Sequence, residues 1–419
     1  MGLFFYNFFL VLYVAGIRIA AIFNKKARLW LDGRNDIFSK LRSWRNAVPA
    51  SEKVIWMHSA SLGEFEQGRP VLSAVKEKYP GYKILVTFFS PSGYEVQKNF
   101  IGAEGVFYLP ADGKENAERF IDIINPSMVI WVKYEYWYYY LTTLHRRKIP
   151  VILISALFLR EQPFFKWYGA IWKKMLDCFT AVFVQNEESF QLLKEKGTGR
   201  NVIVAGDTRF DRVIAIAENR SVLPVQVQNF CNGHRVIVAG STWEEDEEVI
   251  VHYARVHTGI RFIIAPHEID GERLMEIKKL FRGAVYYSEF IADHADGQVL
   301  IIDNIGMLSE LYALADICYI GGGFTDSGIH NVPEAAVYGK PIVFGPAYEK
   351  FAEAIELVER NGAFCIENAL QLEALLDKLF ADESFLRSTG AITKKYIYEK
   401  KGATEKILHY IHENRLLIS

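Results

Sequence analysis

Residues 317–345 read ICYIGGGFTDSGIHNVPEAAVYGKPIVFG, and this stretch decides the predicted fold. A buried-strand run at 317–320 stops at three glycines, 321–323. A polar loop, a predicted helix from Pro333 and a second strand at 341–344 follow. Glycines at the carboxyl end of a strand bring backbone N–H groups close to a ligand, and a helix start adds partial positive charge. The stretch therefore predicts either a phosphate site or a tight turn that binds no ligand.

Polar side chains in the same stretch add to this signal. His330, Asn331 and Glu334 follow the glycines within a dozen residues. The carboxylate of Glu334 is suited to hold paired sugar hydroxyls beside a phosphate. The cluster favours a nucleotide-sugar site over a ligand-free turn, with Gly322 and Gly323 as candidate contacts to the nucleotide.

The same strand-and-helix pattern extends through the rest of the chain. From residue 54 onward, short apolar runs alternate with polar stretches of helix length. Runs of four to six residues that are apolar on both faces are typical of parallel strands covered by helices. The predicted strands are 54–57, 84–88, 106–109, 128–132, 151–154, 181–184, 202–205, 236–239, 262–265, 299–302, 317–320 and 341–344, with weaker candidates at 285–287 and 363–366. We expect two Rossmann-like domains, with ligands outside the carboxyl ends of the strands.

The boundary between the two sets of strands is expected within residues 216–232, where Pro224 and several Gln and Asn residues interrupt the pattern. The predicted domains are an N-terminal membrane anchor (1–30), a first Rossmann-like domain (31–218) and a second (219–419). The last helix is expected to pack back on the first domain. Within the helical segment 383–416 we expect interruptions at Gly390 and Gly402.

Composition restricts the class of protein. The chain has 419 residues, a formal net charge of −2 and a hydrophobic fraction of one half. This length predicts two domains with separate cores, and the balanced charge does not indicate a nucleic-acid surface. The four cysteines lie far apart without a CxxC pair, so we expect reduced packing cysteines in a cytosolic compartment.

The N-terminus differs from the rest of the chain. Residues 3–23 are almost wholly apolar but are broken by Asn7, Gly16 and Arg18, which makes the segment marginal for crossing a bilayer. No basic residue precedes it and no Ala-x-Ala-like site follows, so a cleaved signal peptide is not expected. Residues 18–53 hold nine basic and three acidic side chains. This excess predicts a cytoplasmic domain that contacts anionic lipid at the inner leaflet; the alternative is a buried N-terminal helix followed by a solvated basic one.

Three charged residues follow predicted strand ends in the first half. Glu64 lies where the strand at 54–57 leads into a helix, and there it could be a general base or only a helix-start acid stabilised by the dipole. Glu135 lies among aromatic residues, which suits either a sugar or lipid wall or packed aromatics around a solvated acid. Arg209 could neutralise a leaving phosphate, or it could be a structural partner of Asp207 or Asp211.

Loops after the strands of the second half should converge on one edge of the sheet. They contain Pro266-His267-Glu268 and Asp303-Asn304-Ile305-Gly306-Met307. His267 alone would more simply be a hydrogen-bonded loop histidine. No DxD-like pair, Walker lysine loop or GxGxxG fingerprint occurs, and we expect no metal.

Together these blocks resemble the Kdo (3-deoxy-D-manno-octulosonic acid) transferases of lipopolysaccharide synthesis, from the N-terminal apolar segment to residues 401–403. The motifs that carry the resemblance are His58…Ser61-x-Gly63-Glu64, Pro91-Ser92-Gly93-Tyr94, Glu135-x-Trp137, Gly206-x-x-Arg209-Phe210-Asp211, Gly240-Ser241-Thr242 and the stretch from Gly322 to Glu334. Their order and spacing make a chance agreement improbable.

The resemblance implies an α/β GT-B glycosyltransferase fold, with two Rossmann-like domains that face an inter-domain cleft. It implies a first domain for the lipid acceptor and a second for the donor CMP-Kdo, without metal or other cofactor. Glu64 would be the general base, and Glu135 and Arg209 would stabilise the transition state. The residues assigned to CMP-Kdo are Pro266, His267, Ile305, Gly306, Met307, Asn331, Val332, Pro333 and Glu334, to which the glycine loop adds Gly322 and Gly323.

The implied reaction is an inverting transfer of Kdo from CMP-Kdo to a hydroxyl of the lipid A precursor lipid IVA, at the cytoplasmic face of the inner membrane. Two alternatives stay open. One is a membrane-associated GT-B transferase that uses a UDP-sugar, because Glu334 at a ribose does not select the base. The other is a non-catalytic nucleotide-sugar-binding protein at the membrane.

The chain departs from the family pattern at four places. The family often has Pro-Arg-His, Gly-Glu-Leu and Asn-Ala-Arg where this chain has Pro266-His267-Glu268, Gly306-Met307-Leu308 and Ser155-Ala156-Leu157. Arg209 stands where lysine is usual, which keeps the charge and changes the hydrogen-bond geometry. The arginine contact to the donor that the family pattern implies is therefore either missing here or supplied from another position.

Overall fold

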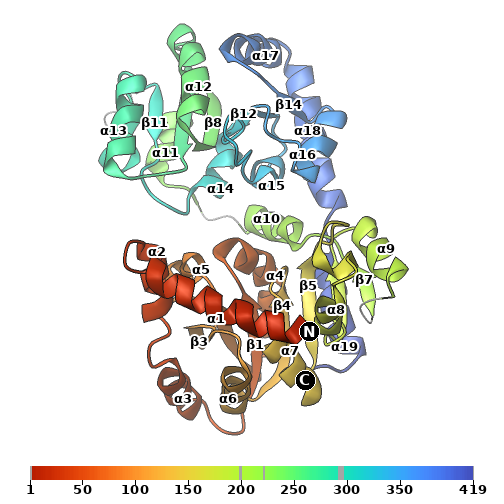
Figure 1. The fold of residues 1–419 in the computed structure, drawn as a ribbon. Helices are drawn as coiled ribbons and strands as arrows, with labels where there is room; N and C mark the ends of the chain where they lie inside the picture. The colour runs from red at the N-terminus through yellow and green to blue at the C-terminus, as the bar shows by residue number, and fades with distance from the viewer. Residues whose placement is uncertain (1, 198–200, 220–221, 291–296, 419) are drawn as a thin grey trace. The chain divides into compact units, whose positions relative to one another are not determined.

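The computed structural model describes residues 2–197, 201–219, 222–290 and 297–418. The chain forms two compact units, the first comprising Met1–Arg212 and Lys401–Ser419 and the second Val213–Lys400. In the described residues each unit contains one seven-stranded sheet, and every strand pairing is parallel (Figure 1). All-parallel sheets occur where helices cover both faces, as the apolar runs predict.

The sheet of unit 1 has the strand order β3-β2-β1-β4-β5-β6-β7. Its strands are β1 (Lys53–Ser59), β2 (Tyr82–Phe88), β3 (Gly105–Tyr108), β4 (Pro126–Val132), β5 (Val151–Ala156), β6 (Ala181–Val184) and β7 (Val202–Val204). Its helices are α1 (Gly2–Ala20), α2 (Lys25–Asp32), α3 (Ile37–Ala47), α4 (Leu62–Lys78), α5 (Pro91–Gln97), α6 (Lys114–Ile124), α7 (Tyr138–Arg146), α8 (Ala170–Leu176), α9 (Glu187–Glu195) and α19 (Ala403–Glu413), while α10 (Thr208–Glu218) runs across the boundary between the units.

Strand β1 illustrates why this sheet is buried on both sides. Val54 and Trp56 belong to one apolar cluster, whereas Ile55 and Met57 belong to another, because successive side chains point to opposite faces. All four are fully buried. The second cluster includes Ile407 of α19, so the C-terminal helix completes the core of unit 1.

The sheet of unit 2 has the order β10-β11-β9-β8-β12-β13-β14. Its strands are β8 (Arg235–Thr242), β9 (Ile260–Pro266), β10 (Val285–Tyr286), β11 (Val299–Ile301), β12 (Ile317–Ile320), β13 (Ile342–Phe344) and β14 (Ala363–Cys365). Its helices are α11 (Val225–Cys231), α12 (Glu244–Val256), α13 (Gly271–Leu280), α14 (Leu308–Leu311), α15 (Val332–Ala336), α16 (Ala352–Glu359), α17 (Ala369–Ala381) and α18 (Glu383–Glu399).

All fourteen predicted strand runs are strands in the described residues, with bounds that differ by at most a few positions. The expected interruption at Gly390 is wrong, because α18 passes through it. A Cβ at Gly390 would lie 2.1 Å from the carbonyl oxygen of Gly339, so this glycine permits close packing rather than a break. Gly402 does interrupt the helices, with a φ of 107°. All four cysteines are free, as predicted.

Helix α1 lies along unit 1 instead of projecting from it (Figure 1). The hydroxyl of Tyr6 donates to Oδ2 of Asp112 at 2.6 Å, and the ring of Tyr13 stacks on that of Phe89 at 6.0 Å. Among the described residues α1 is the one helix that is long and apolar enough to cross a membrane. The contacts of Tyr6 and Tyr13 thus hold one side of α1 against unit 1.

Candidate functional site

Glu64 lies at the edge of unit 1 where β1 and β4 end. Strand β1 stops at Ser59, and α4 begins three residues later at Leu62, after the cap residue Ser61, whose hydroxyl accepts the N–H of Glu64 at 3.4 Å. Since β1 and β4 are paired and parallel, the segment that follows β4 reaches the same edge. That segment carries Glu135.

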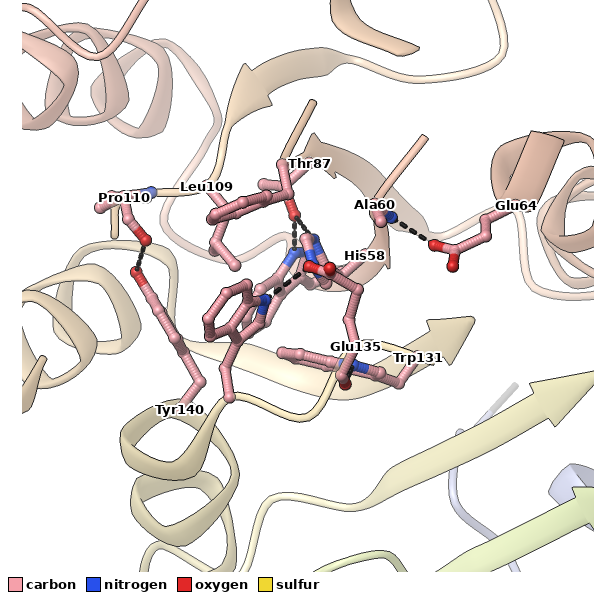
Figure 2. Close-up of polar contacts among 12 residues, drawn as sticks. His58, Ala60, Glu64, Thr87, Leu109, Pro110, Trp131, Glu135 and Tyr140 are labelled. Atoms are coloured by element: carbon pink, nitrogen blue, oxygen red, sulfur yellow. Dashed lines mark hydrogen bonds and ion pairs between the residues drawn. The ribbon is translucent and has the colours of Figure 1, made fainter. Parts of the chain in front are cut away.

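The carboxylate of Glu64 is buried, and only 9% of the residue is exposed. Its Oε2 accepts the N–H of Ala60 at 2.5 Å (Figure 2). Burial, and then the negative charge of Glu135, raises the pKa of Glu64 to about 7, although hydrogen bonds from the N–H groups of Ala60 and Tyr134 and the charge of Lys133 oppose this rise. A carboxylate whose pKa lies near neutral pH can both take up and release a proton, which suits a general base.

Three ring side chains hold Glu135: His58 and Trp131, which are fully buried, and Trp137, which is partly buried. Its Oε2 accepts the indole N–H of Trp137 at 2.6 Å and lies 3.3 Å from Nε2 of His58 (Figure 2). The indole N–H of Trp131 donates to its backbone carbonyl. Glu135 is therefore a positioned carboxylate at the strand edge, and not a solvated acid among packed aromatics.

A chain of hydrogen bonds behind Glu135 holds the ring of His58 in place. The indole N–H of Trp56 donates to Oγ1 of Thr87 at 2.7 Å, and Oγ1 lies 2.9 Å from Nδ1 of His58. The other ring nitrogen of His58, Nε2, faces Glu135. His58 and Thr87 are fully buried, so this chain of hydrogen bonds is shielded from water.

Arg209 lies in the same neighbourhood and forms an ion pair. Its Nε lies 2.8 Å from Oδ2 of Asp207, whose other oxygen accepts the backbone N–H of Arg209. Burial raises the pKa of Tyr134, the charges of Glu64 and Asp207 raise it further, and Arg209 lowers it. The three charges therefore act on one hydroxyl, which brings Glu64 and Arg209 to the same edge of unit 1.

Asp211, the other sequence-predicted partner of Arg209, has a different role. Its two carboxylate oxygens accept the backbone N–H groups of Gly402 and Thr404, each at 2.6 Å. The aspartate therefore ties α10 to the segment that begins α19. Asp211 therefore has a structural role at Gly402.

The glycine loop of unit 2 packs more tightly than the sequence predicts. The N–H of Gly321 donates to the carbonyl of Gly240, and that of Gly322 donates to Oδ2 of Asp246 at 2.8 Å. The N–H groups of these two glycines, which include the predicted ligand contact Gly322, therefore have acceptors within the protein. In the described part of the chain, only Gly323 of the three has no acceptor for its N–H.

Steric crowding accounts for the glycines. A Cβ added at Gly321 would lie 2.3 Å from the carbonyl oxygen of Ser241. A Cβ at Gly322 would lie 2.4 Å from the carbonyl oxygen of Gly328, and one at Gly323 would lie 2.4 Å from the backbone N of Gly345. Gly322 also has a φ of 90°, which disfavours any residue with a Cβ. The three glycines thus allow backbone segments from several loops to meet at one edge of the sheet.

Asp246 is the buried acid beneath this loop. It is fully buried in the first turn of α12 and accepts three hydrogen bonds, from the N–H of Trp243 at 2.9 Å, from the N–H of Gly322 and from the hydroxyl of Tyr319 at 2.9 Å. Burial raises its pKa, and these hydrogen bonds oppose the rise. Asp246 was not predicted from the sequence, although an acid in the first turn of a helix that directly follows a strand is a candidate for the carboxyl edge of the sheet.

Three aromatic rings stack beside the loop. The ring of His267 stacks on those of Trp243 at 4.8 Å and His330 at 4.5 Å, and the indole N–H of Trp243 donates to Nε2 of His330. Burial, and then His267, lowers the pKa of His330 to about 4, so His330 is neutral at physiological pH. His267 is exposed and belongs to this stack, which makes it more than an isolated loop histidine.

The predicted helix at Pro333 is the five-residue α15, which begins one residue earlier at Val332. Val332 and Pro333 are buried and pack in the core, so their side chains are not open to a ligand. Asn331 donates from Nδ2 to Oε1 of Glu334 at 2.7 Å, while its own Oδ1 is buried without a partner. Asn331 and Glu334 therefore form the polar end of this segment.

The remaining donor-side residues differ in exposure. Pro266 is buried at the end of β9, whereas Ile305 is 87% exposed and Gly306 has a φ of 106° in the loop after β11. Met307 accepts a hydrogen bond at its sulfur from Asn304 at 3.0 Å. Strands β11, β9, β8 and β12 are consecutive in the sheet, so the structure brings these loops and the glycine loop to one edge.

Arg273 on α13 is a second residue that the sequence reasoning missed. It forms an ion pair with the fully buried Glu247, which also accepts the hydroxyl of Thr242 at 2.7 Å. Burial raises the pKa of Glu247 to about 7. Glu247 thus links Arg273 on α13 to Thr242, the last residue of β8.

One group of residues in the described ranges could hold a metal ion. His257, Glu373 and Asp377 bring their ligand atoms within 4.8 Å of one another. They belong to the end of α12 and to α17, and none of the sequence-predicted site residues is among them. Two of these carboxylates have other partners, since Oδ1 of Asp377 accepts the hydroxyl of Tyr253 at 3.0 Å and Oε2 of Glu373 lies 3.1 Å from Nε2 of His252.

The chain is similar in sequence to proteins of known family. Residues 35–212 match the family model described as 3-deoxy-D-manno-octulosonic-acid transferase (kdotransferase). The chain is 27% identical over 338 residues to the 3-deoxy-D-manno-octulosonic acid transferase of Aquifex aeolicus, covering 78% of this chain and 86% of that protein. It is 26% identical over 384 residues to the enzyme of the same name from Rickettsia felis, covering 88% and 78%.

A solved structure supports the fold. The UDP-GlcNAc 2-epimerase of Neisseria meningitidis bound to UDP-GlcNAc is 16% identical, with a TM-score of 0.61 over 86% of this chain and 100% of that chain. At this identity the likeness concerns the fold alone. The predicted α/β fold with two Rossmann-like domains and the resemblance to the Kdo transferases are thus confirmed, and these relationships support a glycosyltransferase.

Proposed function

We propose that this chain, whose residues 35–212 carry the Kdo transferase family domain, transfers Kdo from CMP-Kdo to a hydroxyl of the lipid A precursor lipid IVA in lipopolysaccharide synthesis. The observation that carries the proposal is the buried Glu64 carboxylate, whose pKa of about 7 fits a base that works at neutral pH. The relatives from Aquifex aeolicus and Rickettsia felis support Kdo as the transferred sugar.

The proposed reaction is a single displacement with inversion. Glu64 takes the proton of the acceptor hydroxyl, and the oxygen attacks the anomeric carbon of Kdo from the face opposite CMP. The bond between that carbon and the phosphate oxygen breaks, and CMP leaves with the electron pair. Transfer requires that the anomeric carbon reach the hydroxyl that Glu64 deprotonates.

Charge on the departing phosphate is stabilised by protein groups in this proposal, without a metal. Arg209 contributes a guanidinium that Asp207 orients, with Nε 2.8 Å from the carboxylate. In unit 2, the N–H of Gly323 is suited to donate to a phosphate oxygen, and the carboxylate of Glu334 is suited to accept hydrogen bonds from the ribose hydroxyls. Glu135, fixed by His58 and Trp137, stabilises positive charge that develops at the anomeric centre.

We further propose that the protein works at the cytoplasmic face of the inner membrane, where a lipid acceptor lies. The apolar helix α1 and the basic residues that follow it support this location. A direct test is to incubate the purified protein with lipid IVA and CMP-Kdo and to weigh the product by mass spectrometry. A mass increase of one or more Kdo residues is expected, and an unchanged acceptor under conditions in which CMP binds would contradict the proposal.

The alternative of a UDP-sugar donor is tested separately. CMP should compete with the donor at lower concentrations than UDP, in a binding assay on the purified protein. Tighter binding of UDP than of CMP would favour a UDP-sugar transferase. Binding of either nucleotide without any transfer would favour the non-catalytic alternative.

The pKa of Glu64 predicts the pH dependence of the reaction. Because only the ionised form is a base, kcat/KM should rise with pH and level off above about 7. Glu135→Gln removes a neighbouring negative charge that raises this pKa, so the rise should move to lower pH by about one unit. Measurement of kcat/KM against pH for both proteins checks this, and an unmoved midpoint in the variant would show that the charge of Glu135 does not act on the base.

A further inference from the structure

A groove of about 830 Å3 lies in unit 1, lined by α1, by the α2–α3 segment and by the start of α6. None of the residues assigned to catalysis or to the donor lines it. Its volume falls within the range typical of small-molecule and lipid sites. We name it the α1–α3 groove; its walls differ in character, since one is cationic and the other is apolar.

The cationic wall carries the guanidinium groups of Arg18, Arg42 and Arg119. In the part of the chain that the structure describes, no carboxylate lies within ion-pair distance of these three. Neighbouring surface arginines on α7 and at its end behave differently, because Arg146 pairs with Glu118 at 2.8 Å and Arg147 with Asp122 at 2.6 Å. The groove therefore concentrates cationic groups that unit 1 leaves without acidic partners.

The groove also contains Arg34, Asp112 and Asp36, and the first two already form hydrogen bonds within the protein. Arg34 donates to the carbonyls of Leu109, Trp30 and Phe89, which leaves it a structural role. Asp112 accepts hydrogen bonds from the hydroxyl of Tyr6 and from two backbone N–H groups. Asp36, at the start of α3, is the other acidic side chain in the wall. Four arginines against two aspartates leave an excess of positive charge that favours an anion.

The apolar wall continues onto the outer side of α1. Val11, Val14 and Ala15 line the groove next to Arg18. The outward side chains of α1 recur at helical spacing and are more than half exposed: Phe4, Phe8, Leu12 and Ile19. Since Tyr6 and Tyr13 bind the opposite side of the helix to the protein, this exposed apolar face cannot turn inward without loss of those contacts.

We propose that the α1–α3 groove binds the phosphate headgroup of an anionic glycerophospholipid, whose acyl chains lie against the outer face of α1. Arg18, Arg42 and Arg119 would contact the phosphate, and Val11 and Val14 the first methylene groups. Only a ligand that is anionic at one end and apolar at the other matches both walls. Helix α1 then lies in the plane of the leaflet, and the bound phospholipid is a resident lipid distinct from the acceptor.

A charge-reversal experiment tests the cationic wall. Arg42→Glu combined with Arg119→Glu should weaken binding of the full chain to phosphatidylcholine vesicles that contain phosphatidylglycerol by about tenfold or more in a flotation assay. The matched control, Arg146→Glu combined with Arg387→Glu, makes the same change in net charge at exposed positions outside the groove and should keep near-normal binding. Equal losses in both double variants would overturn the proposal in favour of unspecific surface charge.

The identity of the occupant is tested by extraction. Phospholipid that co-purifies with the full chain in mild detergent should be present at about one molecule per chain by mass spectrometry, and absent from the Arg42→Glu, Arg119→Glu protein. Displacement of this lipid by lipid IVA, in proportion to occupancy, would assign the groove to the acceptor and contradict a resident phospholipid. Transfer to detergent-solubilised acceptor should be unchanged in the double variant, so failure of this proposal is distinguishable from failure of the proposed function.

Discussion

Replacement of Glu64 by alanine is expected to reduce kcat/KM for Kdo transfer on the order of a thousandfold, the range typical for removal of a general base. The affinity for CMP should stay within about twofold of wild type, because the residues proposed to hold the nucleotide belong to unit 2. The measurement is product formation by mass spectrometry together with calorimetric titration of CMP. Glu77→Gln, at the exposed other end of α4, is the matched control and should be fully active. Full activity of Glu64→Ala would remove the base from this position.

Loss of activity must be separated from unfolding, and Glu64→Gln does this. Because the pKa of Glu64 is about 7 in the folded chain and 4.5 in a model peptide, the folded state binds more protons between these values. The contribution of Glu64 to stability therefore falls as pH rises through this window, and the ionised, buried carboxylate costs about 3 kcal/mol above it. Glu64→Gln cannot ionise, so at about pH 8 it should be inactive and at least as stable as wild type in urea unfolding.

The fold was predictable because its strands are buried on both faces. Such strands read as continuous apolar runs, and their spacing leaves room for a covering helix between them. The same logic placed Glu64 and Arg209 correctly at strand ends, since parallel strands bring all their carboxyl ends to one edge. No knowledge of side-chain packing was needed for either inference.

Side-chain contacts between residues that are far apart in the chain could not be predicted from the sequence in this way. His58 and Thr87 are separated by 29 residues and meet only because β1 and β2 pair in register, with His58 opposite Thr87. The glycines at 321–323 are a similar case, because their neighbours are backbone atoms of Ser241, Gly328 and Gly345. A glycine run in sequence therefore signals a close approach, but it does not say whether a ligand or the protein itself approaches.

Asp246 is a buried partner of this kind, and the proposed donor site depends on it. Asp246→Ala is expected to lower the free energy of unfolding by about 3 kcal/mol, because the N–H groups of Gly322 and Trp243 and the hydroxyl of Tyr319 lose their acceptor in a buried place. Removal of a desolvated carboxylate offsets part of this loss. Urea unfolding of the full chain, followed by circular dichroism, measures it.

The same substitution should also weaken CMP binding by about tenfold or more. Asp246 fixes the backbone of Gly322, and the next residue, Gly323, is the one glycine of the described 321–323 stretch whose N–H has no acceptor and is proposed to bind the nucleotide. Asp246→Asn keeps one carbonyl oxygen as acceptor and should recover part of both losses. Glu245→Ala removes an exposed acid from the same turn of α12 and should leave stability and CMP affinity unchanged. If Asp246→Ala binds CMP as tightly as Glu245→Ala does, the glycine loop does not contribute to the donor site, and the nucleotide must be held by the His267 stack and Glu334 without it.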